Sequence, residues 1–192
     1  PDLTNLRYTG TVKIDLQLNN PTTCVQFHAY HDISVLQVQI RDQSKSQPTI
    51  NMDSLAYDSK SNIFTVTFPK LSSKNYLLSI QFSTIIRNEL RGLYYSHTTI
   101  NGTQYNIATT KFEPTYARMG FPCLDEPNLK AKFTIIVTLN KATTAKISSP
   151  DFRVISNMLV SHTTETTKEK TWSFIQSLPI STYLVSFIIG EF

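Results

Sequence analysis

Four charged side chains in one irregular segment, residues 109–132, are the best candidates for chemistry. They are Glu113, Arg118, Asp125 and Glu126, in a segment that also holds three of the nine prolines and one of the two cysteines. An arginine can pair with a nearby carboxylate, and a carboxylate beside a proline can accept hydrogen bonds in a turn. We therefore expect Arg118 to pair with Asp125 or Glu126 and to fix the loop.

Glu113 stands apart from these three residues. It precedes Pro114, and a residue before proline favours an extended backbone. An extended carboxylate at the edge of a segment can face a ligand, or it can lie in solvent. The residues alone leave both interpretations open.

The histidines predict no metal site. In an extended strand the spacing of His28 and His31 puts the two side chains on opposite faces, and we expect His97 and His162 on the surface. The sequence has no His-Glu-x-x-His, Gly-x-Ser-x-Gly, Cys-x-x-Cys or glycine-rich phosphate loop. We predict no catalytic residues and no metal ligands in this chain, and we do not expect it to be a complete enzyme by itself.

The cysteines and the one sequon suggest little chemistry. Cys24 and Cys123 are expected to be free, buried thiols, since two cysteines make neither a disulfide framework nor a zinc site. The triplet Asn101-Gly102-Thr103 is typical of a hairpin tip, where Asn101 would accept a glycan if the protein is secreted.

Composition excludes some classes of partner. The 18 basic and 14 acidic residues give a net charge of +4 that is spread along the 192 residues, so we expect no nucleic acid and no contact of this domain with a membrane. The longest mostly apolar run, residues 183–190, is far short of the roughly 20 residues of a membrane helix.

Alternation of apolar and polar residues organises the rest of the chain. It predicts an all-β fold, an antiparallel β-sandwich or saddle-shaped sheet, as a single domain with one long ordered loop at 109–132. We interpret residues 84–96 as the end of a strand and then a loop, with a short helical turn as the alternative. The predicted strands are 8–18, 25–27, 36–40, 63–68, 76–82, a hairpin around Asn101-Gly102, 133–139, 145–149, 154–160, 172–174 and 183–189.

The run TKFEPTYARMGFPCLDEP, residues 110–127, closely resembles the N-terminal domain signature of the aminopeptidase N family of zinc metallo-aminopeptidases. The resemblance continues through nearly the whole chain, in GTVKIDL, LRGLYYS, KAKF and STYLVSFIIGEF. It implies that residues 1–192 are the N-terminal β domain of a longer parent, an interpretation that the abrupt chain ends also favour.

In that family the domain caps a thermolysin-like catalytic domain, which carries the zinc and would be the partner within the same polypeptide. The resemblance implies that Glu113 lines the first specificity pocket and binds the α-amino group of a peptide substrate. Lys111 stands where the family usually has Gln. A cation there would weaken binding of the substrate ammonium, unless the side chain points into solvent.

Two rival functions remain open at this level. One is a non-catalytic relative that serves as an interaction or scaffolding module, and the other is a free-standing adhesion-type sandwich. For location, the sequon favours the extracellular face of the plasma membrane, with an anchor outside this chain, over the cytoplasm.

Overall fold

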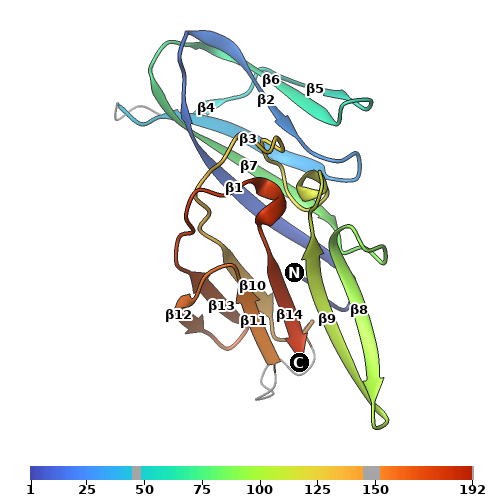
Figure 1. The fold of residues 1–192 in the computed structure, drawn as a ribbon. Coiled ribbons are helices and arrows are strands. Elements are labelled where there is room, and N and C mark those ends of the chain that lie inside the picture. The colour runs from blue at the N-terminus through green and yellow to red at the C-terminus, as the bar shows by residue number, and fades with distance from the viewer. Residues whose placement is uncertain (45–48, 145–151, 192) are drawn as a thin grey trace. The chain divides into compact units, whose positions relative to one another are not determined.

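The regular secondary structure of the protein is almost entirely β-strand, as Figure 1 shows. The computed structural model describes residues 1–44, 49–144 and 152–191. Two short 3-10 helices, η1 (Ala117–Met119) and η2 (Thr182–Leu184), are the helical elements in these ranges. The strands are β1 (Arg7–Gln17), β2 (Thr22–His28), β3 (Ser34–Asp42), β4 (Ile50–Asn51), β5 (Ser54–Asp58), β6 (Ile63–Leu71), β7 (Asn75–Ile85), β8 (Gly92–Ile100), β9 (Thr103–Lys111), β10 (Ile136–Asn140), β11 (Phe152–Ser156), β12 (Val160–Glu165), β13 (Glu169–Phe174) and β14 (Phe187–Glu191).

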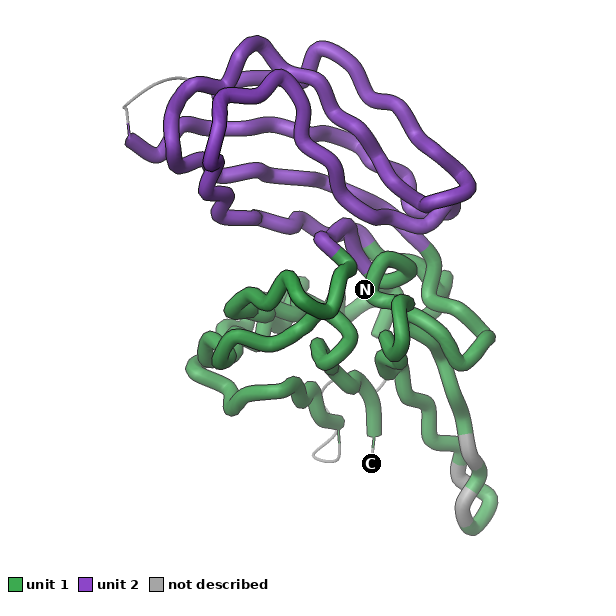
Figure 2. Tube along the Cα trace, turned by 45° about the horizontal axis from the view of Figure 1, so that its top comes forward, with its two compact units in different colours: residues 1–8, 85–120, 125–192 green, residues 9–84, 121–124 purple. Residues whose placement is uncertain are grey.

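The chain folds into two compact units, which Figure 2 distinguishes by colour. Unit 1 comprises Pro1–Tyr8, Ile85–Gly120 and Asp125–Phe192, and unit 2 comprises Thr9–Thr84 and Phe121–Leu124. The units are interleaved along the sequence, so neither is one continuous stretch. That residues 1–192 form one domain of a longer parent stays a prediction.

Unit 2 contains a four-stranded sheet, β1-β7-β3-β4, and a three-stranded sheet, β2-β6-β5. Strands of both sheets alternate buried and less buried residues, as period-two sequences should. In β6, for example, Val66 is fully buried and lies between Val25 and Leu55 of its two antiparallel neighbours. Both sheets thus have an apolar face and a polar face.

Unit 1 contains the sheets β11-β14-β9-β8 and β10-β13-β12. One hydrophobic cluster includes Leu93, Ala108, Val154 and Ile189 from the first sheet and Leu139, Trp172 and Phe174 from the second. Because both sheets contribute to one core, they pack as a sandwich of antiparallel strands. The all-β antiparallel fold class is confirmed.

Several predicted strand limits are wrong. β10 begins at Ile136 instead of residue 133, the strand expected at 154–160 ends at Ser156, and residues 183–189 contain the end of η2 and the start of β14. Strands β4, β5 and β12 were not predicted, and the strand predicted at 145–149 lies outside the described residues. Residues 84–96 were interpreted as the end of a strand followed by a loop. The strand end is correct, because β7 ends at Ile85, but the loop is shorter than predicted, because β8 begins at Gly92.

The predicted hairpin is confirmed. β8 and β9 pair in antiparallel register from Gly92 opposite Lys111 to Ile100 opposite Thr103. Asn101 and Gly102 have φ angles of 50° and 77°, the positive values that a tight two-residue hairpin turn of type I′ requires.

Candidate functional site

Residues 109–132 form the ordered, mostly irregular segment that the sequence predicts. β9 ends at Lys111, η1 makes a single turn, and the remaining residues form only isolated bridges, His28 with Cys123 and Ala131 with Ile180. The segment therefore takes its shape from specific long-range contacts.

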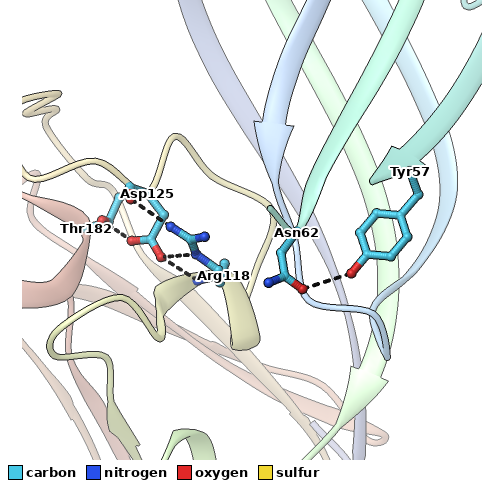
Figure 3. Close-up of polar contacts among 5 residues, drawn as sticks. All are labelled: Tyr57, Asn62, Arg118, Asp125 and Thr182. Atoms are coloured by element: carbon cyan, nitrogen blue, oxygen red, sulfur yellow. Dashed lines mark hydrogen bonds and ion pairs between the residues drawn. The ribbon is translucent and has the colours of Figure 1, made fainter. Parts of the chain in front are cut away.

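Asp125 provides the strongest of these contacts (Figure 3). The Arg118 Nε donates to Asp125 Oδ2 at 2.8 Å, the Arg118 backbone N–H donates to the same oxygen at 3.3 Å, and Arg118 Nη2 donates to the Asp125 carbonyl oxygen at 3.1 Å. The other carboxylate oxygen, Oδ1, accepts a hydrogen bond of 2.6 Å from the buried hydroxyl of Thr182. Only 2% of the Asp125 side chain is exposed, against 17% for Arg118, so the ion pair is largely shielded from water.

Further contacts attach the segment to residues around η2. The Ser181 hydroxyl donates to the Pro127 carbonyl at 2.6 Å, and Ala131 exchanges two backbone hydrogen bonds of 3.0 Å with Ile180. Glu126 is exposed, and the partner of Arg118 is Asp125. Of the two partners that the sequence left open for Arg118, the structure selects the buried one.

In the sequence, Arg118 and Asp125 lie on either side of Phe121–Leu124, the part of the segment that belongs to unit 2. There Cys123 exchanges two backbone hydrogen bonds with His28, at 2.8 and 3.0 Å. Cys123 is a free, buried thiol as predicted, but Cys24 is exposed. The prediction for Cys24 is wrong because its side chain lies on the polar face of β2, in the same row as Thr67 and Ser54.

Glu113 lies just beyond the end of β9, and its carboxylate is exposed. Phe112 before it is only 2% exposed, and Lys111 is exposed again. A buried residue thus separates the two exposed charges, Lys111 at the end of the strand and Glu113 in the turn that follows. The peptide bond from Glu113 to Pro114 is cis.

Phe112 fixes the position of the two charged side chains. Its carbonyl accepts the backbone N–H of Tyr116 at 2.7 Å, and its ring packs so closely on Gly120 that a Cβ there would lie 2.6 Å from a ring carbon. Within the described residues, neither Lys111 nor Glu113 has a side-chain hydrogen bond or ion pair. Both charges are therefore available to a ligand.

Arg91 is a neighbour of this site that the sequence did not suggest. It precedes Gly92, which pairs with Lys111 across the hairpin, and its guanidinium lies 5.2 Å from the centroid of the Tyr116 ring. Such a cation–π contact joins residues 25 positions apart, and no local pattern signals it. The open end of the β8–β9 hairpin, opposite its Asn101-Gly102 turn, thus carries two cations, Arg91 and Lys111, and one anion, Glu113.

Among residues 1–44, 49–144 and 152–191, no three His, Cys, Asp or Glu side chains gather as a metal site would need. Within the same ranges no helix is long and apolar enough to cross a membrane.

Known proteins resemble this chain along its whole length. Aminopeptidase 2, mitochondrial, of Saccharomyces cerevisiae is 33% identical over 198 residues, which cover 100% of this chain and 19% of the yeast protein. The puromycin-sensitive aminopeptidase of Caenorhabditis elegans is 34% identical, with the same two shares. Human glutamyl aminopeptidase is 31% identical over 96% of this chain and 19% of its own length. The chain thus spans about a fifth of these curated relatives.

The sequence model of one protein family covers nearly all of the chain. It is the model of the Peptidase M1 N-terminal domain, and it matches residues 1–184. With the β-sandwich units and the signature segment already described, this match is decisive: the chain belongs to the Peptidase M1 N-terminal domain family.

Proposed function

We propose that this chain is the N-terminal domain of a zinc aminopeptidase that removes single residues from the N-termini of peptides. In this proposal Glu113 binds the α-ammonium group of the substrate, and the domain caps the active site. The observation that carries the proposal is the exposed Glu113 carboxylate, which follows the buried Phe112 just beyond the end of β9 and has no partner within the described residues.

A carboxylate suits this role for a physical reason. A peptide ammonium that enters a closed site loses its water, and a charge-assisted hydrogen bond to a carboxylate offsets that loss. The same carboxylate disfavours a blocked N-terminus, which has no positive charge to offer. Selection of free N-termini is what separates an aminopeptidase from an endopeptidase.

The zinc and the groups that cleave the peptide bond would come from the catalytic domain of the same polypeptide. Three large apolar side chains of unit 1 are strongly exposed, 79% for Leu159, 76% for Leu178 and 62% for Ile136. Leu159 adjoins Ile175, itself 46% exposed, through a backbone hydrogen bond of 3.0 Å. We assign these side chains to the contact with the catalytic domain.

The rival function is a non-catalytic module that binds a partner through the same fold. One observation favours it: the exposed Lys111 beside Glu113 would repel the ammonium of most substrates. For location, we propose an extracellular parent with a glycan on Asn101, which is exposed at the tip of the β8–β9 hairpin.

Assays of the isolated chain and of the full-length parent separate these functions. On an aminoacyl chromogenic substrate, the parent should be active and should lose activity to a zinc chelator, while the isolated chain should be inactive at any zinc concentration. Zinc-dependent activity of the isolated chain would overturn the proposal that the zinc and the catalytic groups come from the other domain. An inactive parent without a His-Glu-x-x-His motif would favour the non-catalytic module.

A further inference from the structure

Lys111 and Glu113 are two exposed side chains of opposite charge, separated by one residue in the chain. Both side chains are exposed, Phe112 between them is buried, and neither charge is paired within the described part of the protein. We propose that Lys111 binds the acidic side chain of the substrate's N-terminal residue, so that the site takes peptides that begin with Glu or Asp. This inference rests on the proposed role of Glu113.

The two charges lie close together in the chain. Lys111 is the last residue of β9 and Glu113 lies in the turn that follows, with only the buried Phe112 between them. An N-terminal glutamyl residue carries its ammonium and its side-chain carboxylate three carbon atoms apart. With the ammonium on Glu113, the substrate carboxylate can reach Lys111 and form a second charge-assisted hydrogen bond.

The residue opposite Lys111 across the β8–β9 hairpin offers it no side-chain partner. This residue is Gly92, which has no side chain to pair with Lys111. Gly92 is constrained by its φ of +68° and by its surroundings, since a Cβ there would lie 3.0 Å from the Met119 Cβ and 3.2 Å from the Arg87 Nε. The fold therefore keeps a glycine beside the lysine.

Charge explains why the lysine would select and not only tolerate acidic residues. A substrate with an uncharged side chain brings an ammonium near the Lys111 ammonium, which is repulsive. An acidic side chain places a negative charge between the two cations and turns the repulsion into attraction. Rejection of neutral substrates and attraction of acidic ones then act in the same direction.

The test compares Glu and Gln as N-terminal residues, because they differ in charge and hardly in shape. We expect the full-length parent to favour a glutamyl over a glutaminyl fluorogenic amide by about tenfold or more in kcat/KM, the size of one charge-assisted hydrogen bond. Lys111→Gln should bring the ratio close to one, and Lys111→Glu should invert it. The exposed Lys130 provides the control, since Lys130→Gln should leave the ratio unchanged.

Glu113→Gln separates this inference from the proposed function. It should lower kcat/KM for both substrates by a similar factor. Loss of activity in Glu113→Gln with no change of ratio in Lys111→Gln would overturn the acidic preference alone, and so would a parent that does not prefer Glu over Gln. If Glu113→Gln keeps full activity, the proposed function fails as well.

Two further measurements cover the remaining outcomes. The Glu-to-Gln ratio should fall as ionic strength rises, because salt screens charges at an exposed site; a ratio that is insensitive to salt would contradict an electrostatic origin. If the parent turns over neither substrate, calorimetry with peptides that begin with Glu or Gln measures the same preference as a ratio of Kd values, and equal Kd values would overturn the inference.

Discussion

The buried carboxylate of Asp125 is the side chain on which the shape of the loop most depends. Asp125→Ala removes the partner of Arg118 and the acceptor of Thr182 together. We expect it to lower the free energy of unfolding by about 2–4 kcal/mol, as when one member of a mostly buried ion pair is removed. Urea denaturation followed by circular dichroism measures this loss. The control is Glu126→Ala, an exposed neighbour that should cost under about 0.5 kcal/mol; equal losses in both variants would contradict the assignment.

Tyr57, in unit 2, provides a prediction of pH dependence. Burial raises its pKa above the usual value, with further contributions from the charges of Tyr30, Asp32 and Asp58. The folded protein thus holds the phenolic proton more tightly than the unfolded chain, so the stabilisation is complete below about pH 10 and is lost as the pH rises through the raised pKa. A difference titration of tyrosinate absorbance between the wild type and Tyr57→Phe should show Tyr57 ionising above the ordinary tyrosine range. Ionisation below that range would refute the prediction. The Tyr57 hydroxyl also donates to Asn62 Oδ1 at 2.9 Å (Figure 3).

At the scale of elements, the pairing of β14 with β9 depends on a glycine. Gly190 has a φ of +148° and lies opposite Ile107, and a Cβ at this position would run into the Asn106 carbonyl oxygen and lie 2.9 Å from the Ile107 Cα. Gly190→Ala should therefore destabilise unit 1 by more than about 2 kcal/mol, since backbone must move.

Gly102 is the matched control for this substitution. Its φ is +77°, but no heavy atom lies within 4 Å of a Cβ there, so Gly102→Ala should cost only about 1 kcal/mol of backbone strain. Thermal unfolding of the two variants measures the difference. A larger loss in Gly102→Ala than in Gly190→Ala would contradict the packing argument.

The elements also show what the sequence could and could not predict. Strands with one face less exposed than the other, such as β1, β3, β6 and β7, were found because alternation is local. β12 was missed because all six of its residues are exposed and no alternation exists. The strand expected at 183–189 is interrupted because Ser181 and Thr182 bind Pro127 and Asp125, over 50 residues away. Long-range partners of this kind leave no periodic signal.

The same limit applies to the site. Residue types made Arg118 and Asp125 candidates for an ion pair, and the structure selected Asp125 over Glu126 by burial. Residue types alone left Glu113 undecided, and only the resemblance to the family gave it a role. Arg91 was missed, because its contact with Tyr116 crosses the hairpin.

At the scale of the whole molecule, substitution of the exposed leucines of unit 1 should affect the thermal stability of the isolated chain and of the full-length parent differently. Replacement of Leu159 and Leu178 by Ser should hardly change the Tm of the isolated chain, where both are more than three-quarters exposed. It should lower the Tm of the parent by several degrees, if these side chains are buried against the catalytic domain. Leu36→Ser, at a 58% exposed leucine of unit 2, is the control and should be neutral in both. Equal shifts in the chain and in the parent would contradict the proposed contact.

The most direct test of the proposed function is the effect of Glu113 on cleavage by the full-length parent. The measurement is kcat/KM for one aminoacyl substrate in the wild type, Glu113→Gln and Glu126→Gln. We predict a loss of about a hundredfold for Glu113→Gln, as when one partner of a buried charge pair is removed, and no loss for the exposed Glu126→Gln. A Glu113→Gln parent with unchanged kcat/KM would show that this domain does not bind the substrate ammonium through Glu113.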